Sequence, residues 1–136
     1  RYPRGAEDCS LDFDKTKDYS IIGNGNKKAI ITYGRLFSEA SKVYEKNNKI
    51  TIIKFNKIYP INPMLLNDIS DFEELHFFEE TIRSGGIGEH WSALLSKSKY
   101  NSKLYIHAIE NEFIKQSSIK SALKNAKLDC DSMLNI

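Results

Sequence analysis

The sequence predicts an α/β fold: a three-layer sandwich with a mostly parallel sheet of about five strands and one antiparallel edge strand. Two patterns indicate this fold. Short β-rich runs alternate four times with segments that carry apolar residues at helical spacing, and parallel strands need such crossover helices. An additional β-rich run stands before this series and is followed directly by a tight-turn sequence, which predicts one antiparallel pair.

The first elements are expected to be a lead-in and a hairpin. Residues 1–19, rich in acids and lysines, are predicted to be a lead-in and linker, and residues 20–136 the folded domain. Residues 20–22 and 29–33 are β-rich and are joined by Gly23-Asn24-Gly25-Asn26, which predicts a hairpin between them. Two glycines at this spacing also occur in dinucleotide fingerprints, but here they join two strands and open no helix, so we favour the turn.

From residue 35 onward the alternation is regular. Residues 35–47 carry a helical apolar stripe, and residues 50–55 form the nearly continuous apolar run that is typical of a buried strand. Asn62 and Pro63 predict the start of the next helix. Residues 75–78 and 104–109 are the remaining strands, a helix follows the glycines at 85–88, and Ser117 or Ser118 is expected to cap the last helix.

Composition restricts the class of protein. The chain has 136 residues, 40% of them hydrophobic and 28% charged, which suits one soluble domain. The net charge is only +2, so nucleic-acid binding is disfavoured, and the spacing of Lys115, Lys120, Lys124 and Lys127 is more typical of a solvated helix face. No apolar run is long enough to cross a membrane and no leader precedes the domain, so we expect a cytoplasmic protein.

Cysteines and histidines predict neither a disulfide framework nor a metal site. Cys9 and Cys130 lie near opposite ends and are expected to be free thiols in a reducing compartment, with an end-to-end disulfide as the alternative. His76, His90 and His107 are scattered without metal-ligand spacing.

Two acidic residues and a glycine loop are the polar features closest to a possible site. Gly85-Gly86-Ile87-Gly88 precedes a helix and could hold an anion, although a sharp turn with close packing is favoured. Glu79 and Glu80 are adjacent in a strand and therefore point to opposite faces, which excludes a joint acid–base role. One is expected to cap the loop amides or contact a neighbouring domain, and the other to face solvent or form an ion pair. Ser84 and His90 lie in no catalytic motif, so no catalytic residue is predicted.

Taken in order, several segments resemble the C-terminal domain of the 1-deoxy-D-xylulose-5-phosphate synthases, thiamine-diphosphate-dependent enzymes of the transketolase family. The absence of an initial methionine also suggests a piece of a longer chain. The resemblance covers nearly the whole chain, and its motifs are Arg1-Tyr2-Pro3-Arg4-Gly5, residues 29–34, Pro60-Ile61, Phe78-Glu79-Glu80, Gly85-Gly86-x-Gly88, Phe113-Ile114-x-Gln116 and Leu128-Asp129.

The resemblance implies a supporting role in a larger enzyme. These enzymes join pyruvate and glyceraldehyde 3-phosphate with loss of CO₂, and their product feeds isoprenoid and thiamine synthesis. Thiamine diphosphate and Mg²⁺ lie between two other domains, so this chain alone is expected to bind neither and to be inactive. It would support a homodimer and brace the active-site domains. Arg4 matches an arginine that helps to bind the acceptor's phosphate, and the guanidinium fork suits that ligand.

The chain also departs from the family pattern. Asn56 stands for an arginine, Asn62 for an acid, and Lys115 and Ser117 for a proline and a glycine. The C-terminal domain of another transketolase-type enzyme or of a 2-oxo acid dehydrogenase β subunit is therefore a second reading. A stand-alone, non-catalytic assembly module is a third.

Overall fold

The computed structural model describes residue 9 and residues 11–25, 27–110 and 117–136. Its centre is a five-stranded sheet in the order β1-β3-β2-β4-β5. The strands are β1 (Tyr19–Ile22), β2 (Lys28–Tyr33), β3 (Thr51–Phe55), β4 (Glu74–Ile82) and β5 (Lys103–Ile109). The helices are α1 (Leu36–Lys46), α2 (Leu65–Asp68), α3 (Ile87–Ser96), α4 (Ile119–Asn125) and α5 (Cys130–Leu134).

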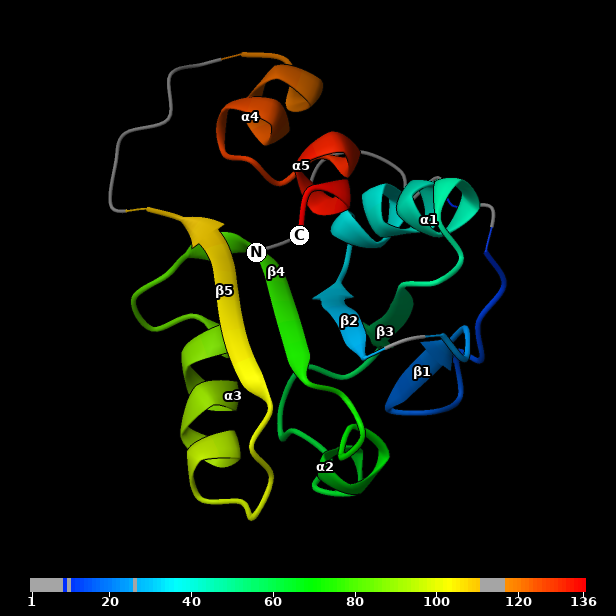
Figure 1. Ribbon diagram of the computed structural model, residues 1–136. Helices are drawn as coiled ribbons and strands as arrows, with labels where there is room; N and C mark the ends of the chain where they lie inside the picture. The colour runs from blue at the N-terminus through cyan, green and yellow to red at the C-terminus, as the bar shows by residue number, and fades with distance from the viewer. Residues whose placement is uncertain (1–8, 10, 26, 111–116) are drawn as a thin grey trace.

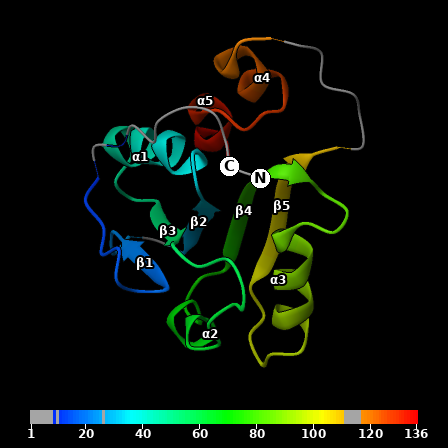
Figure 2. The same cartoon turned by 180° about the vertical axis from the view of Figure 1, so that it is seen from behind.

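The sheet is parallel except at one edge. Strands β3, β2, β4 and β5 run parallel, and only β1 is antiparallel, paired with β3. Helices α1, α4 and α5 lie on one face, and α2 and α3 on the other (Figures 1 and 2). The predicted three-layer α/β sandwich with one antiparallel edge strand is therefore confirmed.

The predicted hairpin is wrong, because β1 pairs with β3 and not with β2. Its register runs from Tyr19 opposite Phe55 to Ile22 opposite Ile52. Both sides of β2 are taken by the parallel neighbours β3 and β4, so β1 pairs instead along the open side of β3. The glycine turn instead carries the chain past the start of β3, where Thr51 Oγ1 donates to the Gly25 carbonyl at 2.7 Å. A Cβ at Gly25 would lie 2.6 Å from the Lys49 carbonyl oxygen, so only glycine fits this crossing.

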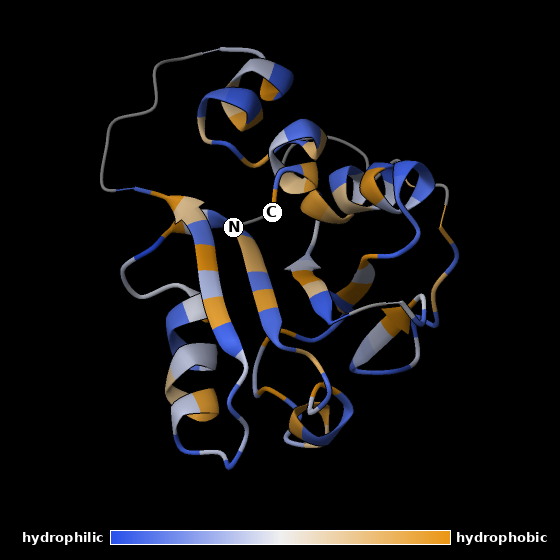
Figure 3. Ribbon diagram, viewed as in Figure 1, coloured by the Kyte–Doolittle hydropathy of each residue, from blue (hydrophilic) through white to orange (hydrophobic). Residues whose placement is uncertain are grey.

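Two apolar clusters fill the space between the layers. Along β5, an edge strand, hydrophobic and hydrophilic residues alternate (Figure 3), whereas every residue of β3 is buried. One cluster joins α1, α4 and α5 to the sheet through Ile30, Leu36, Phe37, Ala40, Val43, Ile52, Phe78, Leu123, Leu128 and Met133. The other joins α2 and α3 to the opposite face through Ile31, Ile53, Leu65, Ile69, Phe77, Trp91 and Leu95.

The segment before β1 contacts the first of these clusters. Leu11 and Phe13 pack against it. The Phe13 ring meets Phe37 edge-on at 5.2 Å between centroids, and Lys54 Nζ lies 3.5 Å from the Phe13 centroid. A lysine in a buried strand is thus placed over an aromatic face, where a cation is attracted by the ring quadrupole. The domain boundary at residue 19 stays a prediction.

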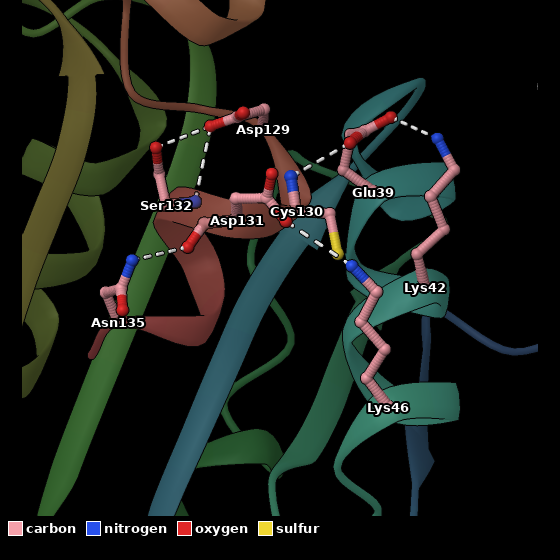
Figure 4. Close-up of polar contacts among 8 residues, drawn as sticks. All are labelled: Glu39, Lys42, Lys46, Asp129, Cys130, Asp131, Ser132 and Asn135. Atoms are coloured by element: carbon pink, nitrogen blue, oxygen red, sulfur yellow. Dashed lines mark hydrogen bonds and ion pairs between the residues drawn. The ribbon is translucent and has the colours of Figure 1, made fainter.

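The sequence reasoning missed the last helix, α5. Its signal was Asp129, whose side chain accepts a hydrogen bond from the Ser132 amide at 3.3 Å, as an N-cap does. Figure 4 shows how α5 is fixed to α1: Glu39 Oε2 accepts from the Cys130 amide at 2.9 Å, and Lys46 Nζ lies 3.3 Å from Asp131 Oδ1. Cys9 and Cys130 are not joined in a disulfide, which agrees with the predicted thiols.

The other predicted elements agree with the structure, with two changes of length. Ser118 caps α4 by accepting from the Ser121 amide at 3.2 Å. The helix predicted to start at Asn62 and Pro63 begins later: α2 starts at Leu65 with Met64 as its N-cap and is only four residues long, and Asn62 Oδ1 accepts from the Met64 amide at 3.0 Å in the turn before it. Strand β4 runs on through Ile82, so both Glu79 and Glu80 lie inside it. None of the helices in the described part of the chain has the length and apolar character that crossing a bilayer requires.

Candidate functional site at the carboxyl edge of the sheet

The polar residues singled out from the sequence meet where β2 ends beside β4. From β2 the chain continues through α1 to β3 on one side, and from β4 it continues through α3 to β5 on the other. The gap between β2 and β4 is therefore the point at which the strand order reverses. In open α/β sheets, ligands bind outside the carboxyl ends of the strands at such a point.

Strand β4 is irregular at this position. Phe78 pairs with His107 and Ile82 with Ile109, so five residues of β4 lie along only three residues of β5. Such an irregularity bends a strand and re-aims its side chains. Glu79 points toward α3 and Glu80 toward the start of α1, which confirms that the two carboxylates serve opposite faces.

Glu79 is fully buried and accepts four hydrogen bonds. The amides of Ile87 and Gly88, in the first turn of α3, donate to it at 2.9 and 3.2 Å. The hydroxyls of Tyr33 and Thr81 donate at 3.2 and 2.9 Å. A negative charge at a helix N-terminus is favourable, and here the protein supplies it from its own chain.

The glycine loop is shaped around this carboxylate. A Cβ at Gly86 would collide with Glu79 Oε1, and one at Gly88 would lie 2.9 Å from the same atom and from Ile106. Gly85 has φ +77°, and its amide donates to Glu89 Oε2 at 2.8 Å. The amides that could have held a ligand's phosphate are therefore occupied by Glu79 and Glu89, and the interpretation as a tight turn with close packing is confirmed.

Burial of Tyr33 beside Glu79 changes its acidity. Burial, with the negative charge of Glu79 as a second cause, raises the pKa of Tyr33 to about 12. The phenol thus stays protonated and serves as a hydrogen-bond donor at every physiological pH.

Glu80 forms a partly buried ion pair with Arg35. Arg35 Nε donates to Glu80 Oε2 at 3.2 Å, and its Nη2 contacts the other carboxylate oxygen. A planar guanidinium that meets both oxygens of a carboxylate is the strongest arrangement of such a pair. It ties β4 to the residue before α1, so the expectation of an ion pair for the second glutamate is also confirmed.

The other polar side chains near the carboxyl edge of the sheet are more exposed than Glu79 and Glu80. Arg83 pairs with Glu110 at 2.6 Å and donates to the Ile106 carbonyl at 2.7 Å. Ser84 and His90 are exposed, and the ring centroid of His90 lies 6.4 Å from that of Tyr59. Sequence reasoning did not mark Tyr59, although an aromatic residue beside a proline in a loop was a visible signal.

This edge holds elements together and offers little to a reacting molecule. Glu79 has no exposed surface, and its oxygens accept bonds that fix the start of α3. In the ranges that the structure describes, no group of three metal-ligating side chains occurs. The edge therefore fits neither a diphosphate nor Mg²⁺. That thiamine diphosphate and Mg²⁺ bind to other domains stays a prediction, and Arg4, the predicted phosphate ligand, lies outside the described residues.

The fold is shared with a solved structure. The chain superposes on a split-gene transketolase, solved as an inactive β4 tetramer, with a TM-score of 0.75 at 16% identity over 92% of this chain and 42% of that one. The chain thus has the fold of a transketolase domain. No family model matches it.

Named relatives show which enzymes of this type the chain is similar to. The chain is similar to 1-deoxy-D-xylulose-5-phosphate synthases from Pasteurella multocida (strain Pm70) and Actinobacillus pleuropneumoniae serotype 5b (strain L20), at 29% and 30% identity over 95% of its length. That of Francisella tularensis subsp. novicida (strain U112) is 25% identical over 94%. The chain spans 22% of the length of each of these relatives. Both comparisons agree on a domain of the transketolase type, and they confirm the resemblance to these synthases that the motifs indicated.

Proposed function

We propose that this chain is the C-terminal domain of a thiamine-diphosphate-dependent 1-deoxy-D-xylulose-5-phosphate synthase. One observation carries the proposal: similarity to proteins of that name runs through 94–95% of the chain. The proposed reaction of the whole enzyme joins pyruvate and glyceraldehyde 3-phosphate, with loss of CO₂, in the cytoplasm.

Within that enzyme the domain's task is support. Its best-connected polar residues, Glu79 and Glu80, fix α3 and α1 to the sheet instead of facing a substrate. When bound in the other domains, thiamine diphosphate would supply the carbanion chemistry and Mg²⁺ would hold its diphosphate. This domain would brace those domains and the homodimer.

Arg4 is the one residue of the chain that we assign to a substrate, namely to the phosphate of glyceraldehyde 3-phosphate. A charge-assisted bond to phosphate contributes about 1.5–3 kcal/mol, so Arg4→Ala should raise KM for this substrate roughly tenfold or more. KM for pyruvate, which carries no phosphate, should change far less. Lys120→Ala, which removes an exposed positive charge from α4, is the control. Equal changes for both substrates would contradict the role of Arg4.

The decisive experiment uses the full-length polypeptide that carries this chain. The purified protein is supplied with thiamine diphosphate, Mg²⁺, pyruvate and glyceraldehyde 3-phosphate, and 1-deoxyxylulose 5-phosphate is measured by mass spectrometry. Formation of this product with pyruvate-dependent CO₂ release is expected. Ketol transfer from xylulose 5-phosphate without use of pyruvate would instead assign the domain to a transketolase. Oxidative decarboxylation coupled to a lipoyl acceptor would assign it to a 2-oxo acid dehydrogenase.

A further inference from the structure

The loop between β3 and α2, residues 56–64, exposes apolar side chains beside the carboxyl edge of the sheet. Its residues are Asn56-Lys57-Ile58-Tyr59-Pro60-Ile61-Asn62-Pro63-Met64. Tyr59 is 72% exposed, Met64 60% and Ile58 40%. Large apolar side chains scattered singly over a surface are ordinary, but here three of them lie within seven residues of one loop.

Hydrogen bonds hold the first part of this loop to the segment before β1. The amides of Asn56 and Lys57 donate to the Asp18 carbonyl at 2.9 and 3.0 Å. The Asn56 side chain donates to the carbonyls of Asp14 and Lys17, both at 2.9 Å. The position after β3 is therefore fixed by four bonds to one neighbouring segment.

The second part is fixed in the same way. Asn62 Nδ2 donates to Asp18 Oδ2 at 2.9 Å, and its Oδ1 accepts from the Met64 amide. Ile61 packs inward against the cluster under α2 and α3. Pro60 and Pro63 restrict the backbone further. Asn56 and Asn62 are two of the positions that depart from the family pattern, and both serve to hold this loop.

A loop fixed in this manner presents Ile58, Tyr59 and Met64 in one arrangement. Association is more favourable when the contacting side chains are already ordered, because less conformational freedom is lost. Aromatic anchors of this kind contribute most of the binding energy at protein interfaces. The exposed loop thus has the properties of a preformed contact surface.

We infer that this surface, Ile58, Tyr59 and Met64, is where the domain docks on the part of the same polypeptide that carries the cofactor-binding domains. The inference rests on the proposed function. The chain spans only 22% of the length of its relatives, so in a protein of that size most of the polypeptide lies outside it and an intramolecular partner is at hand. The three side chains carry no charge, and the neighbouring Lys57 lies 3.9 Å from Asp18, so the surface fits an apolar patch of that partner better than a phosphate or a nucleic acid.

The two methionines of the chain provide a direct test. Met64 is 60% exposed in this domain, whereas Met133 is fully buried. The full-length protein is treated with dilute hydrogen peroxide under native conditions, and sulfoxide formation at both positions is followed by peptide mass spectrometry. If the loop is docked, Met64 is oxidised about as slowly as Met133.

Matched variants locate the docking contact. Tyr59→Ser and Ile58→Ser should weaken docking and accelerate oxidation of Met64 roughly tenfold, because tenfold in an opening equilibrium corresponds to about 1.4 kcal/mol and a buried anchor contributes at least that. Ile119→Ser, which alters a side chain of similar exposure (46%) on α4, should leave the rate unchanged. Slow oxidation of Met133 in each variant shows that the domain is still folded.

Two results would overturn the inference. Oxidation of Met64 in the full-length protein at the rate of an unfolded methionyl peptide would mean that the loop is free. Oxidation that accelerates on dilution would assign the surface to a second subunit. Neither depends on product formation, so a protein that protects Met64 but makes no 1-deoxyxylulose 5-phosphate refutes the proposed reaction and leaves the docking surface in place.

Discussion

Glu79→Gln should destabilise the domain through the first turn of α3. The substitution keeps the size of the side chain but replaces one carboxylate oxygen by an NH₂ group. Three donors converge on Oε2, and the Gly88 amide donates to Oε1. The glutamine oxygen can replace only one of these acceptors. Its best orientation serves the three donors and turns the NH₂ group toward the Gly88 amide, so that two donors face each other.

The expected loss follows from these contacts. A buried donor left without its acceptor costs about 1–3 kcal/mol. Loss of the negative charge at the helix N-terminus adds up to about 1 kcal/mol. Glu79→Gln should therefore lower the free energy of unfolding by roughly 1–4 kcal/mol, which can be a large part of the stability of a domain of this size.

Trp91 reports this change directly. It is the only tryptophan, lies fully buried in α3, and meets Phe55 edge-on at 6.0 Å. Urea unfolding is followed by its fluorescence and by circular dichroism. Glu110→Gln makes the same chemical change in an exposed ion pair with Arg83 and should have a far smaller effect. An unfolding free energy for Glu79→Gln within about 0.5 kcal/mol of the wild type would refute the role assigned to Glu79, since that is the range of ordinary surface substitutions.

Three further changes test the remaining contacts. Gly86→Ala should destabilise by about 2 kcal/mol or more, because its methyl group displaces the Glu79 carboxylate; urea unfolding without loss of stability would contradict this. Phe13→Ala should lower the free energy of unfolding by about 2–3 kcal/mol, since Phe37 and Lys54 both lose an aromatic contact. A lower urea midpoint, with an unchanged dependence of the unfolding free energy on urea concentration, measures this loss. His107 hydrogen-bonds to His76 at 3.1 Å; burial, with the charges of His76 and Arg83 as lesser causes, lowers the pKa of His107 to about 4. Burial likewise lowers the pKa of His76, against the opposing effect of Glu74, while Lys28 adds to the lowering. The unfolded chain therefore binds these protons first, so the contribution of the two histidines to stability is constant above pH ~6.5 and falls as the pH decreases toward 4. His107→Gln should make that fall shallower, and an unchanged pH profile of the urea midpoint would contradict the assignment.

Local patterns in the sequence were sufficient for the elements themselves. Apolar spacing marked the helix at residues 35–47, and the continuous apolar run at residues 50–55 marked a central strand. Ser118 marked the start of α4. Each of these signals lies within a few residues of chain, where side-chain periodicity and capping act. The same reasoning at Asp129 would have found α5.

The pairing of β1 could be decided only by the tertiary structure. The turn after Ile22 predicted a hairpin from local chemistry, but a strand pairs with whichever neighbour has a free hydrogen-bonding side. Because β2 is enclosed between β3 and β4, that neighbour is β3. Strand order depends on contacts between residues far apart in the sequence, which no local window contains.

The candidate site also combines features set by local sequence with features set by contacts between distant residues. The sequence by itself determined that Glu79 and Glu80 serve opposite faces and that the glycines at 85–88 form a turn before a helix, because strand alternation and the missing Cβ are local properties. That Glu79 fills the turn's anion position, and that Asn56 and Asn62 hold an exposed apolar loop, was decided only when folding brought β4 against α3 and the loop against residues 14–18. The physical reason is that a hydrogen-bond partner is chosen by proximity in space, and sequence spacing fixes that proximity only within an element.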